Sequence, residues 1–188
     1  MKIKSTLLFF GEVLKIVVLA LVIVIPIRYF IFQPFIVKGV SMEPTFHNGD
    51  YLIIDEFSYY FREPQRGEVI VFRYPENLSE KFIKRIIGLP GEKIELRGSQ
   101  IIIAGQSGEE IVLDESDYLT SSDLLGDKEF VLGKGEYFVL GDNRSHSFDS
   151  RNWGSLARGD IIGKVAFRAF PPTAMAYFSA PDYKAPEF

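Results

Sequence analysis

The sequence contains no cysteine and only two histidines, His47 and His146. The absence of cysteine excludes disulfides, thiolate nucleophiles and cysteine–zinc sites, and two imidazoles do not suffice for a histidine-rich metal site. We therefore expect no metal and no cofactor. A basic excess is also missing, because 21 lysines and arginines stand against 25 acidic residues, so no nucleic-acid partner is predicted.

The 188 residues are enough for one ordinary domain, but their charges are unevenly distributed. Residues 1–38 carry five basic residues and one acidic residue, a balance of +4, whereas residues 39–188 carry 16 basic and 24 acidic residues, a balance of −8. A basic, apolar head on an acidic, polar body is typical of a membrane anchor joined to a soluble domain. We expect the anchor within residues 1–34 and a β-rich domain over residues 35–188.

Residues 16–27 form an apolar run of twelve residues without a charge. A bilayer requires about 20 apolar residues, and apolar neighbours on both sides extend the run to a workable transmembrane helix over residues 8–30. A cleaved signal peptide would need a small-x-small site downstream, where residues 27–37 are bulky, and a buried core helix would show a polar stripe. The flanking basic residues weakly favour a cytoplasmic N-terminus, since Lys2, Lys4 and Lys15 precede the run and Arg28 and Lys38 follow it.

Beyond Gly39 the apolar residues occur in short runs that end at turn residues, and no helical periodicity is sustained. This pattern predicts a mainly β, antiparallel domain. Residues 109–129 hold eight acidic residues without the spacing of a calcium loop, which predicts a solvated insertion, and residues 171–188 are expected to pack loosely. The predicted strands cover residues 51–54, 68–72, 82–87, 93–96, 100–103, 111–113, 137–140 and 161–167.

Three polar clusters could carry chemistry, and the first is residues 39–45, which follow the anchor and a short extended piece. Ser41 stands just before a turn shaped by Pro44. Such a turn can present the serine hydroxyl beside backbone N–H groups that are free to bind an oxyanion. An ordinary serine-containing turn explains the same residues, so this cluster alone does not establish a nucleophile.

The second cluster, residues 82–92, places Lys84 in a predicted strand. Because side chains alternate along a strand, Phe82, Lys84 and Ile86 share one face. Apolar neighbours remove water from an ammonium group and lower its pKa, which is what a lysine general base requires. A lysine that protects an edge strand from aggregation is the structural alternative.

The third cluster is the polar loop of residues 141–154, which follows the predicted strand over residues 137–140. Asp149 and Arg151 could pair, and Ser147 could exchange a hydrogen bond with a neighbouring amine. A loop with so many functional side chains and only two large apolar residues is typical of a site held on a scaffold.

Together the three clusters resemble the bacterial type I signal peptidases, membrane-bound serine proteases that remove signal peptides from exported proteins. The resemblance covers most of the chain and rests on the segments SMEPT, NGDYLII, KRIIGLPGE and GDNRSHSFDSR, in the family's order. It implies a Ser–Lys dyad with Ser41 as the nucleophile and Lys84 as the general base. The residues that it implies as supports are Ser147, which would orient the lysine, the ion-paired Asp149 and Arg151, and the nearby Asp142.

The resemblance also implies how substrate and membrane meet the enzyme. Secretory preproteins with small residues at the first and third positions before the cut would bind in extended form, with Phe35, Val37 and Ile83 as candidate walls. The Ser41 N–H would be one oxyanion donor, but some relatives supply a second from a serine at the position of Gly39, so the second donor is left open. We expect a monomer that crosses the cell membrane once and contacts its lipid, with a cytoplasmic N-terminus and an extracytoplasmic catalytic domain.

Three alternatives compete with this interpretation. Ser41, His146 and Asp149 could form a catalytic triad, although the family's eukaryotic reticulum branch has its histidine where Lys84 stands here. Self-cleaving SOS repressors share a Ser–Lys dyad and a related β-fold, but they lack an N-terminal span and the GDNR loop. A membrane-anchored β module without enzymatic activity would leave Lys84 and the third cluster unexplained.

Overall fold

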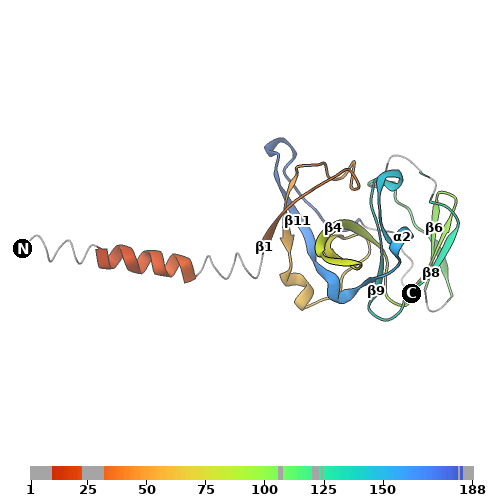
Figure 1. The fold of residues 1–188 in the computed structure, drawn as a ribbon, viewed down its shortest axis with the longest axis horizontal. Coiled ribbons are helices and arrows are strands. Elements are labelled where there is room, and N and C mark those ends of the chain that lie inside the picture. Colours follow the sequence, from red (N-terminus) through yellow and green to blue (C-terminus); the bar gives the residue numbers. More distant parts are fainter. Residues whose placement is uncertain are drawn as a thin grey trace, which may run out of the picture.

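The computed structural model describes residues 10–22, 32–105, 108–119, 123, 125–181 and 183. Residues 10–22 form a helix, drawn in red in Figure 1, in which Lys15 and Glu12 form an ion pair of 3.0 Å. Among the described residues, no helix is both long enough and apolar enough to span a membrane. The expected span of residues 8–30 extends past this helix at both ends, into residues that lie outside the described ranges.

The described residues after this helix form two antiparallel sheets and their connections, so the mainly β, antiparallel fold predicted from the sequence is confirmed. In the larger sheet the spatial order is β1-β2-β11-β3-β4-β9-β10, with β12 paired to β11, and in the smaller sheet it is β7-β6-β5-β8. Figure 1 shows β6 and β8 beyond β9, on the side away from β1. The strands are β1 (Phe32–Ile36), β2 (Tyr51–Asp55), β3 (Val69–Tyr74), β4 (Asn77–Gly88), β5 (Lys93–Arg97), β6 (Gln100–Ala104), β7 (Glu110–Val112), β8 (Lys128–Val131), β9 (Glu136–Leu140), β10 (Leu156–Ala157), β11 (Ile161–Phe170) and β12 (Ala176–Tyr177).

Short helical turns connect several of these strands. The 3-10 turn η1 (Phe57–Tyr60) follows β2, and η2 (Arg144–His146) and α2 (Ser150–Trp153) shape the loop between β9 and β10. The turns η3 (Arg158–Asp160) and η4 (Pro172–Ala174) precede and follow β11.

Strand β4 runs through the centre of the hydrophobic core. Its first half pairs only with β3 and is exposed, whereas from Arg85 onward it also pairs with β9. Ile83, Ile86 and Ile87 belong to three different clusters of buried side chains, so both faces of this part of the strand are covered. The two residues between these isoleucines, Lys84 and Arg85, are therefore buried as well.

The acidic segment of residues 109–129 is exposed at most of its described positions, as its charge predicted, and it is also attached to the smaller sheet. It contributes β7 and the start of β8, which pairs with β5, and both Leu113 and Leu125 are buried. A few apolar residues within the segment are enough to fix it to the smaller sheet.

The C-terminal tail also packs more closely than expected. Strand β12 pairs with β11, and the rings of Phe178 and Phe46 lie 4.5 Å apart between centroids. Further along, the hydroxyl groups of Tyr183 and Tyr118 are 2.8 Å apart. Aromatic side chains fix this part of the tail, because each ring buries a large apolar area.

Candidate active site

A tight turn, anchored by two buried side chains that follow the serine, presents Ser41. The Glu43 N–H donates to the Val40 carbonyl at 3.1 Å, and the Phe46 N–H donates to the Met42 carbonyl at 2.8 Å. Met42 and Phe46 are almost fully buried, whereas Ser41 is only half-buried. The core therefore holds the turn on one side while the serine faces outward on the other.

Lys84 reaches Ser41 from β4. Its Nζ atom donates to Ser41 Oγ at 2.8 Å and to the Ile83 carbonyl at 2.9 Å, and it lies 5.6 Å from the centre of the Phe82 ring. The side chain is only 4% exposed, and among the described residues no carboxylate forms a salt bridge with it. Nucleophile and base side chains at hydrogen-bonding distance are the arrangement that acyl transfer requires.

Burial lowers the pKa of Lys84 from its ordinary value of 10.5 to about 8. The cause is desolvation, which disfavours the charged ammonium form. The negative charges of Asp149 and Asp142 oppose this shift, and the positive charge of Arg151 supports it. The amine is thus available in neutral form near physiological pH.

Asp142 is paired with the neighbour of Lys84 on β4 rather than with Lys84 itself. Arg85 donates from Nε to Asp142 Oδ1 at 2.9 Å and from a terminal nitrogen to Oδ2 at 2.7 Å. Thr45, in the turn of Ser41, donates to the same carboxylate at 2.5 Å, and the Tyr118 ring covers the guanidinium at 3.9 Å. One buried ion pair therefore ties together β4, the turn of Ser41 and the loop after β9.

Asp149 and Arg151 form a second ion pair, at 2.8 Å. Asp149 is fully buried and caps α2, and it also accepts a hydrogen bond of 3.1 Å from the Gly141 N–H. Arg151 donates further to the Arg144 carbonyl at 2.6 Å. The pair thus closes the loop of residues 141–154 on itself and brings both charges near Lys84.

Ser147 lies beside Ser41 but makes no hydrogen bond to Lys84. Its Oγ atom is buried and has no hydrogen-bond partner within the described part of the chain. It lies against the Cα atom of Gly141, where a Cβ atom would collide with Ser147 Oγ and come within 2.5 Å of the Ser41 carbonyl oxygen. The resemblance implies that Ser147 orients Lys84. In this structure the Ser147 hydroxyl lies close to the site but forms no hydrogen bond with the lysine.

A groove of about 840 Å³ runs along Ser41 and Lys84, between residues 35–41 and residues 79–84. Phe35 and Ile83, two of the candidate walls, lie on it. Val37, the third, does not, which corrects the prediction. The Val37 N–H donates to the Asp50 carbonyl, and the Val37 carbonyl accepts from the Gly49 N–H. With the backbone held in this way, the Val37 side chain lies in the core and is 2% exposed.

The alternative triad is not assembled. The exposed His146 ring lies 3.2 Å from Asn143 Oδ1 and 3.1 Å from Ser145 Oγ through Nδ1. Within the described ranges it bonds neither Ser41 nor Asp149, and the carboxylate of Asp149 is already occupied by Arg151 and backbone N–H groups.

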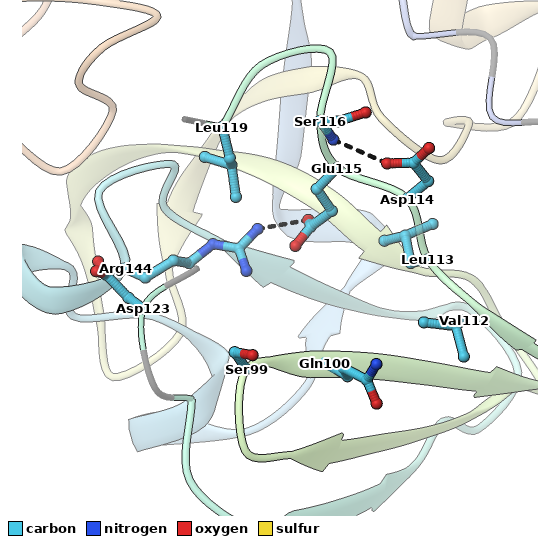
Figure 2. A pocket seen from close by; sticks show the side chains of 10 residues that line it. All are labelled: Ser99, Gln100, Val112, Leu113, Asp114, Glu115, Ser116, Leu119, Asp123 and Arg144. Atoms are coloured by element: carbon cyan, nitrogen blue, oxygen red, sulfur yellow. Dashed lines mark hydrogen bonds and ion pairs between the residues drawn. The ribbon is translucent and has the colours of Figure 1, made fainter. Parts of the chain in front are cut away.

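Sequence reasoning missed several residues that build the loop. Arg144 donates to the Gly141 carbonyl at 2.9 Å and to Glu115 at 2.5 Å, and Figure 2 shows this ion pair at a second cavity of about 510 Å³. Asn143 bonds the turn of Ser41 twice. The strand alternation offered one signal, since it places Arg85 on the face opposite Lys84, but no local pattern indicated Glu115 or Asn143.

Comparison with known proteins identifies the family. A profile described as "Signal peptidase, peptidase S26" matches residues 10–170. A probable signal peptidase I-1 of Synechocystis sp. is 37% identical over 87% of this chain and 84% of its own length, and a signal peptidase IB of Staphylococcus aureus is 33% identical over 88% and 92%. A crystal structure of a signal peptidase I from Enterococcus faecalis is 31% identical and covers 55% of this chain and 97% of its own, with a TM-score of 0.46. This chain belongs to the signal peptidase family, peptidase S26.

Proposed function

We propose that this chain is a membrane-bound serine endopeptidase that cleaves signal peptides from secretory preproteins, with Ser41 as the nucleophile and Lys84 as the general base. The observation that carries the proposal is the 2.8 Å contact between Lys84 Nζ and Ser41 Oγ on an open groove. Family membership supports the reaction class, because curated relatives that match more than four fifths of this chain are named signal peptidases.

In the first half of the reaction, Ser41 Oγ attacks the carbonyl carbon of the scissile bond while the neutral amine of Lys84 takes the hydroxyl proton. The carbonyl oxygen becomes an oxyanion beside the Ser41 N–H, which has no acceptor among the described residues. When the C–N bond breaks, the ammonium of Lys84 returns the proton to the leaving amine, and an acyl ester remains on Ser41.

In the second half, a water molecule attacks the ester and Lys84 takes one of its protons. Collapse of the second tetrahedral intermediate releases the signal peptide with a carboxylate end, and Ser41 Oγ recovers its proton from Lys84. Asp149, Arg151 and Asp142 hold the loop and set the charge around Lys84, and Ser147 supplies a hydroxyl beside the reacting groups.

The groove supports binding of an extended peptide. Strand β1 is the outermost strand of its sheet, and the exposed first half of β4 pairs on one side only. Both offer unpaired backbone groups to a substrate that adds as a strand, with alternate side chains pointing into the wall. Phe35 and Ile83 line this groove, and we expect them to select small residues, such as alanine, at the first and third positions before the cut.

We also propose that the chain crosses the cell membrane once near its N-terminus and keeps the catalytic domain on the extracytoplasmic side. The uncharged run of residues 16–27 supports this placement. Phe57, Tyr60 and Phe61 support it further, since they are 48%, 73% and 75% exposed. They follow Asp55, which pairs with the first residue of β1, and exposed aromatic rings beside an anchor fit the lipid headgroup region.

Cleavage of a purified preprotein by the detergent-solubilised chain tests the catalytic proposal. We expect Ser41→Ala to abolish cleavage and Ser99→Ala, which changes an exposed serine between β5 and β6, to leave it intact. Replacing alanine by phenylalanine at the residue before the cut should block cleavage of the preprotein. Cleavage by Ser41→Ala, or indifference to that phenylalanine, would contradict the proposal.

Fractionation of cells that express the full chain tests the membrane proposal. We expect the chain to stay with the membranes after an alkaline wash, and an added protease to degrade its catalytic domain in spheroplasts without lysis. Release by the alkaline wash would contradict the anchor, and protection of the domain in intact spheroplasts would reverse the orientation.

A further inference from the structure

Asn143 holds the nucleophile turn at two consecutive carbonyl groups. Its backbone N–H donates to the Ser41 carbonyl at 3.0 Å, and its side-chain Nδ2 donates to the Val40 carbonyl at 3.1 Å. The two segments are 103 residues apart in the chain. Asn143 therefore connects the loop after β9 to the turn that carries Ser41.

The bond to Val40 fixes the direction of the Ser41 N–H. The Val40 carbonyl and the Ser41 N–H belong to one planar peptide unit, which is trans. In such a unit the C=O and N–H point in opposite directions, so holding the oxygen also aims the hydrogen. The Val40 oxygen accepts from Asn143 and from the Glu43 N–H, whereas the Ser41 N–H has no acceptor among the described residues.

The side chain of Asn143 is itself held in one orientation. Its Oδ1 atom lies 3.2 Å from His146 Nδ1 and 3.4 Å from Ser145 Oγ. Because the Val40 carbonyl can only accept, the amide must present its NH2 group there and its oxygen to His146. The His146 N–H also donates to the Asn143 carbonyl at 3.1 Å, which closes the turn between the two residues.

We propose that Asn143 is the positioning residue of the oxyanion site, acting through the Val40–Ser41 peptide, and that His146 supports it by fixing the amide. This inference rests on the proposed Ser41–Lys84 mechanism. A preorganised donor stabilises the oxyanion without reorganising during the reaction, and a hydrogen bond to its carbonyl strengthens the N–H as a donor. Position 39 is a glycine, which has no hydroxyl to act as a second oxyanion donor. Stabilisation of the oxyanion therefore depends more strongly on the orientation of the Ser41 N–H.

The test compares Asn143→Leu, which keeps the branching of the side chain but removes its side-chain hydrogen bonds, with Asn48→Ala. Asn48 is the matched control, because its Oδ1 accepts from the Gly39 N–H in the same loop at 3.0 Å without touching the Val40–Ser41 peptide. For Asn143→Leu we expect kcat on a preprotein to fall about 10- to 100-fold with KM nearly unchanged, while Asn48→Ala stays near wild type.

Binding of a peptide aldehyde separates positioning from a general loss of structure. The aldehyde forms a hemiacetal with Ser41 whose oxygen occupies the oxyanion position, whereas the matching peptide alcohol binds only in the groove. We expect Asn143→Leu to weaken binding of the aldehyde by the same factor by which kcat falls, and to leave binding of the alcohol unchanged. Equal losses for both compounds, or an equal loss in Asn48→Ala, would overturn the inference.

His146→Phe keeps the test valid if Asn143→Leu does not fold, because the His146 side chain is exposed. We expect a smaller, several-fold loss confined to kcat and to the aldehyde, and unchanged aldehyde binding in this variant would overturn the inference too. An active Ser41→Ala chain would instead refute the proposed function, so the two failures are distinguishable.

Discussion

Lys84 and Arg85 are adjacent cations on β4, equally buried at 4% exposure, but within the described part of the chain only Arg85 is paired with a carboxylate. Arg85 forms a two-pronged bond with Asp142, which raises its pKa despite burial. Lys84 bonds the Ser41 hydroxyl and a backbone carbonyl instead. A cation without a carboxylate partner in a dry site loses its proton more easily, so Arg85 stays charged within an ion pair while Lys84 can become neutral, as the proposed base must.

The lowered pKa of Lys84 predicts a stability effect of defined sign. Between pH 8 and 10.5 the unfolded chain binds more protons at this position than the folded chain, so the wild type gains stability as the pH rises. Lys84→Met removes this dependence and should be no less stable than wild type at pH 7.

Urea unfolding, followed by the fluorescence of Trp153, measures the effect. The advantage of Lys84→Met in free energy of unfolding should shrink by roughly 2–3 kcal/mol between pH 7 and pH 10. An advantage that stays constant or grows with pH would show that burial does not lower this pKa.

The charges around Lys84 predict opposite shifts of the pH–rate profile. Asp149→Asn removes a negative charge that raises the pKa of Lys84, so the rising limb of kcat/KM should move to lower pH. Asparagine is also a good helix N-cap, which preserves the start of α2. Arg151→Gln removes a positive charge and should move the limb to higher pH. Shifts of both variants in the same direction would contradict this electrostatic assignment.

Gly141 is predicted to tolerate no side chain. A Cβ atom there would collide with Ser147 Oγ and lie 2.5 Å from the Ser41 carbonyl oxygen, so Gly141→Ala should lower the stability by about 1–3 kcal/mol and reduce kcat/KM strongly. Gly159→Ala is the control, since no atom lies within 4 Å of its added Cβ. The comparison uses thermal unfolding and preprotein cleavage, and an active, stable Gly141→Ala chain would refute the close approach.

His146→Ala distinguishes the dyad from the triad. His146 bonds Asn143 and Ser145 but not Ser41, so we expect its removal to cost no more than about tenfold in kcat. A triad histidine would cost about 10⁴-fold or more. The measurement is kcat for cleavage of one preprotein by wild type and His146→Ala. A folded but inactive His146→Ala chain would favour the triad.

The sequence predicted the parts of the fold and site that depend on local pattern. Short apolar runs indicated most of the strands, and strand alternation together with motif resemblance singled out Ser41 and Lys84 as the residues that the structure brings to 2.8 Å. The sequence predicts only a short extended piece over residues 35–38, whereas β1 covers Phe32–Ile36 and contains Pro34. An edge strand accepts a proline, since one side needs no donor.

Contacts between distant segments could not be predicted from local sequence pattern. Whether Val37 lines the groove or enters the core depends on the turn after β1, which its bonds to Asp50 and Gly49 determine. The clamp of Asn143 on Val40 joins residues 103 positions apart. No periodicity or composition encodes such a pairing, because it arises only when β9 is placed beside β4.

The most direct measurement is the pH dependence of kcat/KM on one preprotein for wild type, Lys84→Ala and Lys84→Arg. Wild-type activity should rise through a pKa near 8, well below the ordinary 10.5 of lysine, because only the neutral amine takes the Ser41 proton. Both variants should be inactive, since alanine has no base and guanidinium stays protonated. Substantial cleavage by folded Lys84→Ala would contradict the Ser41–Lys84 dyad.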